Sequence, residues 1–146
     1  MNPTSLTIDP ATGRIMLPVG GTGSFIARLS FDEEIEINKD DCIVLFSMSK
    51  AKNIGVQQHR AAIITKRLEL NVDEEGELYV QVTFVNADTR ELKPGNYVWD
   101  LTIITDPETL DDGSVVVEDD SDNVIPIFAR TGALPMITLC EVTYIV

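Results

Sequence analysis

Short runs in which apolar and polar residues alternate recur along this chain, and this period of two limits the fold more than any other feature. In residues 24–30, for example, every second residue starting at Phe25 is apolar, as in a strand with one buried face. A helical period is absent, except that residues 86–95 are compatible with one turn capped by Asn86 or Asp88. The pattern predicts an all-β domain, an antiparallel β-sandwich of roughly seven to nine strands.

One of the expected strands carries apolar residues on both sides. Residues 42–50 place Val44, Phe46 and Met48 on one side and two further apolar residues on the other. We therefore expect this strand to be covered on both faces.

A β-hairpin is expected in the middle of the chain. Residues 61–70 and 77–85 are alternating runs joined by an acidic turn that contains Gly76. Further strands are expected at residues 15–19, where Pro18 indicates a sheet edge, and at 24–30, 97–104 and 136–146.

The stretch ELKPGNYVWDLTII, residues 91–104, predicts a corner followed by a strand. Pro94 fixes its backbone angle φ and Gly95 tolerates positive φ, so the pair favours a tight turn. Beyond the turn, Tyr97, Trp99 and Leu101 point to one side, and we expect them to be buried; Asp100 marks the wetter face. A buried tyrosine here would return its hydroxyl to a nearby backbone group, as in the tyrosine corner of immunoglobulin-like sandwiches.

Several segments resemble small immunoglobulin-like modules encoded among phage tail and baseplate genes. Residues 92–103, LKPGNYVWDLTI, resemble the Leu-x-Pro-Gly-x-Tyr-x-x-Asp-Leu stretch of these modules, and residues 85–95 resemble the approach to it. Residues 20–29, GGTGSFIARL, are similar to their opening strand, although Gly21 stands where those modules usually have Asp. Residues 40–50, DDCIVLFSMSK, resemble their Asp-x-Val-x-Phe-x-Val-Lys strand.

The resemblance implies a non-enzymatic structural or assembly module of a phage tail or baseplate. Such a module would act through protein–protein contacts with itself, as a homo-oligomer, or with other virion proteins. The resemblance carries over no catalytic, cofactor-binding or metal-binding residue. The alternative is a carbohydrate-binding or adhesion sandwich, which is disfavoured because aromatic residues make up only 6% of the chain and Trp99 is expected in the core.

Length and charge point to one acidic domain. The 146 residues predict a single domain over 1–146, with residues 1–13 as a flexible N-terminal segment. The net charge of −13 disfavours binding to nucleic acid or anionic membrane. Arg14 interrupts the apolar residues near the start, and no run has the length of a membrane span. We therefore expect a protein that is cytoplasmic when made and then incorporated in a virion.

Candidate sites for chemistry are few. The GGTGS stretch at residues 20–24 lacks the ending of a phosphate-binding loop and precedes a predicted strand, so we expect a turn. The one histidine, His59, is expected in an exposed loop. The acidic stretches DPETLDDG, residues 106–113, and DDSDN, residues 119–123, could supply calcium ligands but are explained equally well as solvated loops. We therefore predict no catalytic, cofactor or metal residues.

Two features are left open by the sequence. Cys42 and Cys140 can pair only if the fold brings them together. The apolar connection at residues 124–136 is expected to contribute to an oligomer or docking contact. The competing account places its large apolar residues in the core of the monomer: Ile125, Ile127, Phe128 and Leu134.

Overall fold

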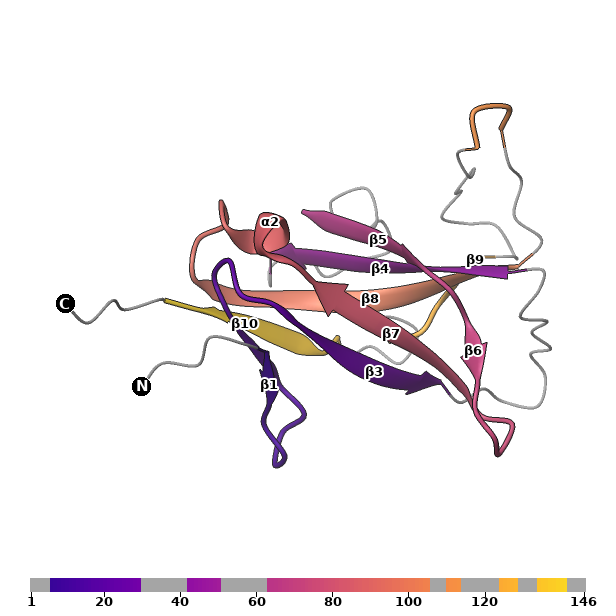
Figure 1. Ribbon diagram of the computed structural model, residues 1–146, viewed down its shortest axis with the longest axis horizontal. Helices are drawn as coiled ribbons and strands as arrows, with labels where there is room; N and C mark the ends of the chain where they lie inside the picture. Colours follow the sequence, from indigo (N-terminus) through magenta and orange to yellow (C-terminus); the bar gives the residue numbers. More distant parts are fainter. Residues whose placement is uncertain are drawn as a thin grey trace.

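The computed structural model describes residues 6–29, 42–50, 63–105, 110–113, 124–128 and 134–141. In these ranges the chain forms ten strands and one helical turn, and the strands make two sheets packed face to face (Figure 1). The predicted all-β sandwich is therefore confirmed. The elements are β1 (Thr7–Ile8), β2 (Ile15–Pro18), β3 (Gly23–Leu29), β4 (Cys42–Lys50), β5 (Ile64–Leu68), β6 (Asn71–Val72), β7 (Leu78–Phe84), α2 (Asn86–Thr89), β8 (Gly95–Thr105), β9 (Val124–Pro126) and β10 (Met136–Cys140).

The larger sheet is organised around β8, its longest strand. Its strand order is β1-β2-β10-β8-β4-β5, with β9 also paired to β8. On one side β8 pairs with the whole of β4, from Lys50 opposite Tyr97 to Cys42 opposite Thr105. On its other side β8 pairs first with β10 and then with β9. Two short strands thus share one edge of β8.

The sequence led us to expect a strictly antiparallel sheet, but one pair of its strands is parallel. β2 and β10 run parallel, with Ile15 opposite Ile137 and Leu17 opposite Leu139. These strands come from the two ends of the chain, so no hairpin connection constrains their relative direction. Pro18 lies beyond the two residues of β2 that pair with β1, and so sits on a locally free edge, as predicted.

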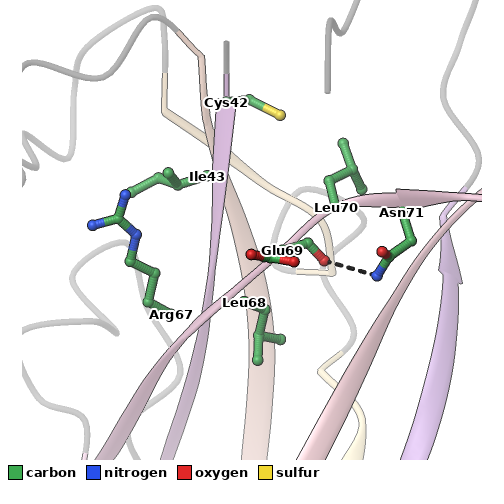
Figure 2. A pocket seen from close by; sticks show the side chains of 7 residues that line it. All are labelled: Cys42, Ile43, Arg67, Leu68, Glu69, Leu70 and Asn71. Atoms are coloured by element: carbon green, nitrogen blue, oxygen red, sulfur yellow. Dashed lines mark hydrogen bonds between the residues drawn. The ribbon is translucent and has the colours of Figure 1, made fainter. Parts of the chain in front are cut away.

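The smaller sheet has the order β3-β7-β6. The chain crosses from the larger sheet to the smaller one between β5 and β6 (Figure 2). β5 pairs with β4 in the larger sheet, and β6, which begins after a two-residue connection, pairs with β7 in the smaller one. The hairpin predicted between residues 61–70 and 77–85 is therefore wrong in its first strand: residues 64–68 pair with β4, and the residues that pair with β7 are Asn71 and Val72, beyond the predicted run. The chain changes sheets because Leu70 turns into the core between them, where it is buried.

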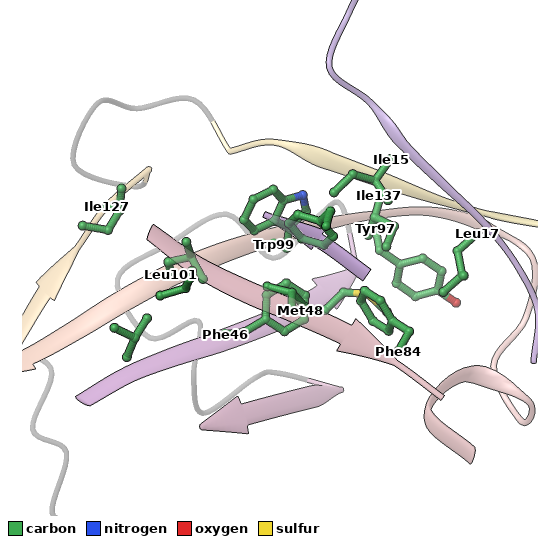
Figure 3. Close-up of a cluster of buried hydrophobic side chains, with 14 of the residues drawn as sticks. Ile15, Leu17, Phe46, Met48, Phe84, Tyr97, Trp99, Leu101, Ile127 and Ile137 are labelled. Carbon is green, nitrogen blue, oxygen red and sulfur yellow. The ribbon is translucent and has the colours of Figure 1, made fainter. Parts of the chain in front are cut away.

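The two sheets enclose a continuous apolar core. Figure 3 shows part of it, with Ile127 at one end, Leu17 at the other, and Trp99 and Met48 between them. Four aromatic rings meet near its centre: Phe25 stacks on Phe84 at 6.4 Å and lies 5.1 Å from Trp99, and Phe46 meets Phe84 edge to face at 5.7 Å. The inward residues of β3, β4 and β8 are those that the alternation predicted.

The predicted tyrosine corner is present. The Tyr97 ring is buried and its hydroxyl donates a hydrogen bond of 2.8 Å to the backbone carbonyl of Lys93, four residues earlier. Leu92, just before the turn, packs against the core. The bond holds the approach to the turn against the first residues of β8, so the direction in which β8 enters the sheet is defined locally.

Removal of the Tyr97 hydroxyl tests this corner. We expect Tyr97→Phe to lower the free energy of unfolding by about 0.5–1.5 kcal/mol, because it removes one hydrogen bond and keeps the ring. The matched control is Tyr79→Phe on β7, where the side chain is only partly buried and the change should stay within about 0.5 kcal/mol. Equal effects of the two changes in urea unfolding would show that the corner bond contributes nothing specific.

Asp100 does not mark a wet face, contrary to the prediction from the sequence. It is only 2% exposed, and its neighbours on the same face of β8, Val98, Thr102 and Ile104, are also buried. β8 is therefore buried on both faces.

Asp100 can be buried because backbone N–H groups donate hydrogen bonds to it near the point where β9 and β10 meet along β8. Its Oδ1 accepts hydrogen bonds from the backbone N–H groups of Leu101 and Phe128, each at 2.8 Å. The Leu101 carbonyl accepts a bond from the Ile127 N–H at 2.8 Å. The carboxylate thus satisfies a donor where the backbone ladder between strands is interrupted.

The strand predicted to be covered on both faces is confirmed as such. Val44, Phe46 and Met48 face the core, and Ile43 on the opposite face is buried as well. Ser47, opposite Asp100 on β8, is also buried.

The C-terminal apolar segment belongs to the fold of the monomer in its described part. Ile127 is a member of the core, Ile125 and Phe128 pack against it, and the Phe128 ring meets Trp99 edge to face at 5.1 Å. The competing account, which places the large apolar residues of 124–136 in the core, is therefore confirmed for Ile127 and supported for Ile125 and Phe128, whereas Leu134 is half-buried outside the core cluster. A contribution of this segment to an oligomer or docking contact stays a prediction. In β10, Ile137 and Leu139 face the core; residues 142–146 of the predicted final strand lie outside the described ranges.

Candidate functional site

Several candidates from the sequence lie outside the described residues. These are His59 and the acidic stretch at residues 119–123. Of the other acidic candidate, the structure describes residues 110–113, an exposed turn in which the Gly113 N–H donates to the Leu110 carbonyl at 2.9 Å. Within the described ranges, no group of three or more His, Cys, Asp or Glu side chains is arranged to hold a metal ion.

The glycine-rich stretch at residues 20–24 forms hydrogen bonds that connect distant parts of the chain. As predicted, a turn is followed by a strand, β3. The Gly20 N–H donates to Thr89 Oγ1 at 2.8 Å, and its carbonyl accepts a bond from Asn86 Nδ2 at 2.9 Å. Both partners lie in α2, so two hydrogen bonds join the turn between β2 and β3 to the helical turn after β7.

Substitution of Gly20 is opposed both by its backbone conformation and by a neighbouring side chain. Its φ is +75°, and an added Cβ would lie 2.9 Å from Asn86 Nδ2. We expect Gly20→Ala to cost about 2–3 kcal/mol of unfolding free energy, from backbone strain and loss of the Asn86 bond. Gly13→Ala is the matched control, because Gly13 has φ +73° with open space around it, and it should cost only about 1–2 kcal/mol. Thermal unfolding of both variants makes the comparison; equal costs would refute the role of Asn86.

The N-cap position of the helical turn α2 is Val85, and neither Asn86 nor Asp88 as the sequence suggested; Asp88 contributes from the third helical position. Its Oδ2 accepts the Val85 N–H at 2.8 Å and also forms an ion pair with Lys66 Nζ at 2.8 Å. The Lys66 ammonium lies 5.8 Å from the centre of the Phe84 ring. This group links β5 to α2 across the two sheets and so has a structural role.

A shallow depression of about 580 Å³ lies beside the crossover between the sheets (Figure 2). Its polar groups include the Cys42 thiol at the start of β4, Arg67 on β5, and Glu69, with Asn71 Nδ2 donating to the Glu69 carbonyl at 3.2 Å. Among its described lining residues there is no histidine and no second carboxylate to pair with Glu69.

Cys42 and Cys140 cannot pair within one chain. Cys42 lies opposite Thr105 at one end of β8, and Cys140 lies just past Gly95 at the other end (Figure 1). The 11-residue length of β8 separates them, roughly 30 Å at about 3.3 Å per residue. A disulfide needs Cα atoms within about 7 Å, and neither cysteine forms one in the described structure.

The acidic hairpin turn between β6 and β7 is organised by Asp73. Its Oδ1 accepts the backbone N–H groups of Glu75 and Glu77, each at 2.9 Å, and Oδ2 forms an ion pair with Arg28 at 2.8 Å. The hydrogen bond from the Glu77 N–H is the main cause that lowers the pKa of Asp73 below its usual value of 3.8.

This lowered pKa predicts a pH dependence. The folded chain favours the Asp73 carboxylate, so its contribution is complete above the unfolded pKa near 3.8 and disappears as the pH falls through the lower folded value. We expect the stability difference between wild type and Asp73→Asn to shrink over that acidic range. An NMR titration that placed the Asp73 pKa at or above 3.8 would contradict the expectation.

Within the described ranges, no helix has the length and apolar character needed to cross a bilayer. Comparison with protein-family models, with curated proteins and with solved structures finds no match to this chain.

Two structurally important residues escaped the analysis of the sequence. The fully buried Thr89 binds a glycine 69 residues away in sequence, and no local pattern signals that contact. For Asp100 a signal existed: it is a single acid inside the apolar run YVWDLTII.

Proposed function

We propose that this protein is a non-enzymatic assembly module that acts through protein–protein contacts, as a component of a phage tail or baseplate. The observation that carries the proposal is the Tyr97 corner. The residues that make it, Leu92, Pro94, Gly95 and Tyr97, are the ones that resemble the phage-encoded modules, and the Tyr97 hydroxyl binds the Lys93 carbonyl at 2.8 Å. Residues on which the resemblance depends therefore form a contact that stabilises this fold, and this supports the proposal.

The arrangement of the sandwich supports the same proposal. Its conspicuous polar groups, Asp88, Asp100 and Thr89, are occupied by backbone or ion-pair contacts that hold the fold together. Surface contacts are then the means by which such a module would act.

The carbohydrate-binding alternative would need an exposed aromatic face. Trp99 is 6% exposed and lies among the core rings. Tyr79, on the outer face of the smaller sheet, is partly exposed and is the residue on which that alternative would depend. A glycan-array signal that disappears in Tyr79→Ala would favour the alternative over our proposal.

Co-purification with particles tests the proposed function. Phage particles made from the genome that encodes this chain would be banded in a density gradient, washed in high salt and analysed by mass spectrometry. We expect the chain in the particle band at a constant ratio to the tail proteins. Its recovery only at the top of the gradient, with the host's cytoplasmic proteins, would overturn the proposal.

A further inference from the structure

Among the described strands, β3 has one long edge that no other strand covers. It pairs with β7 on one side, and no described strand pairs with it on the other (Figure 1). Near its start, Leu6 covers the edge, because its N–H donates to the Thr22 carbonyl at 3.1 Å. Residues 24–28 are therefore the open part, and Ile26 in their middle is 56% exposed.

The other strands that border the described sheets are short or charged. β1 and β6 have two residues each, and β5 carries Lys66 and Arg67. Short length and positive charge are the usual devices that prevent pairing between molecules, whereas an open strand without them is a template for another strand. β3 has seven residues, no proline, and Arg28 as its single charge.

We propose that a second copy of this chain pairs with β3, antiparallel about a two-fold axis through Ile26, so that the two smaller sheets become one. This inference rests on the proposed function, since it names one contact of an assembly module. The two-fold pairing places Ile26 opposite its own copy and Ser24 opposite Arg28 of the second chain. On the inner face it places Phe25 opposite Ala27, a large side chain against a small one.

Charge favours a second copy as the occupant. The chain has a net charge of −13, so most pairs of surfaces would bring carboxylates together. Residues 24–28 contain no acid, and Arg28 is already neutralised by Asp73 at 2.8 Å. In the two-fold register Arg28 meets a serine and not its own copy, so the strand is complementary to itself in charge as well as in shape.

The first test is the oligomeric state in solution. We expect the wild-type chain to form dimers in sedimentation equilibrium, and Ile26→Lys to raise the dimer dissociation constant about tenfold or more, since like charges then lie directly opposite. Gln81→Lys is the matched control. Gln81 is the exposed neighbour of Ile26 on β7, one strand away from the edge, and the change should leave the dimer nearly intact.

The second test reads the register directly by cross-linking. In chains that carry Cys42→Ser and Cys140→Ser, we expect Ile26→Cys to form a disulfide-linked dimer on mild oxidation, because directly opposed Cβ atoms lie about 5 Å apart. Ser24→Cys and Arg28→Cys should each form no disulfide-linked dimer alone, and should cross-link to one another when mixed. These single variants are the controls for chance collision.

The outcomes separate this inference from the proposed function. A strictly monomeric wild type overturns pairing between copies. A dimer that Ile26→Lys leaves intact, or that cross-links through Ser24→Cys alone, shows another surface or register and overturns it too. In each of these cases, recovery of the chain in the particle band would still support the assembly role. Its absence from that band would refute the assembly role, whatever the oligomeric state.

Discussion

Trp99→Ala is expected to lower the free energy of unfolding by about 3–5 kcal/mol, among the largest effects of a single change in this chain. The indole lies 5.1 Å from Phe25, 5.8 Å from Phe46 and 5.1 Å from Phe128, measured between ring centres. Because these rings come from four different segments, the cavity left by alanine cannot close by a local movement. Urea unfolding followed by circular dichroism measures the loss.

The control for this change is Trp99→Phe. The indole Nε1 is buried and has no hydrogen-bond partner in the described structure, so phenylalanine removes an unsatisfied donor while keeping a ring. We expect a cost well below that of alanine, about 1–2 kcal/mol. A loss below about 1 kcal/mol for Trp99→Ala would show that the side chain is not in the core.

Asp100→Ala is the second change with a large expected effect, about 2–4 kcal/mol of unfolding free energy. Removal of the carboxylate takes the acceptor from the backbone N–H groups of Leu101 and Phe128, in a region where Asp100 itself is almost fully buried. The segment after β9 would then lose one of its attachments to β8.

Asp100→Asn separates hydrogen bonding from charge. The amide keeps one acceptor oxygen of the same shape, so we expect it to retain at least half of the stability that alanine loses. Hydrogen exchange at the Phe128 amide should speed up in Asp100→Ala and much less in Asp100→Asn. If alanine cost less than about 0.5 kcal/mol, the proposed role of the carboxylate at the junction would be wrong.

The faces of β3, β4 and β8 could be predicted because they depend on local geometry. Side chains in a strand alternate, so Phe25, Val44 and Trp99 identify the inward face without knowledge of the partner strand. The tyrosine corner was predictable for the same reason: the donor and acceptor, Tyr97 and Lys93, are only four residues apart.

The junction at Asp100 could not be predicted, because its environment comes from residue 128 on a distant segment. An aspartate in a strand usually faces water, and burial is favourable only when backbone donors converge on it. The crossover between β5 and β6 was hidden as well, since residues 61–70 alternate without a break and nothing local marks a change of sheet at Leu70.

The sequence alone determined the class of fold, the tyrosine corner, and the inward residues of the main strands, because all of these follow from geometry over a few neighbouring residues. Only the tertiary structure decided that β2 and β10 run parallel, that Gly20 is fastened to Thr89, and that Ile127 belongs to the core. It also decided that β3 has one edge without a partner among the described strands. These contacts join residues far apart in the chain, and their stability depends on which surfaces meet after the strands have formed.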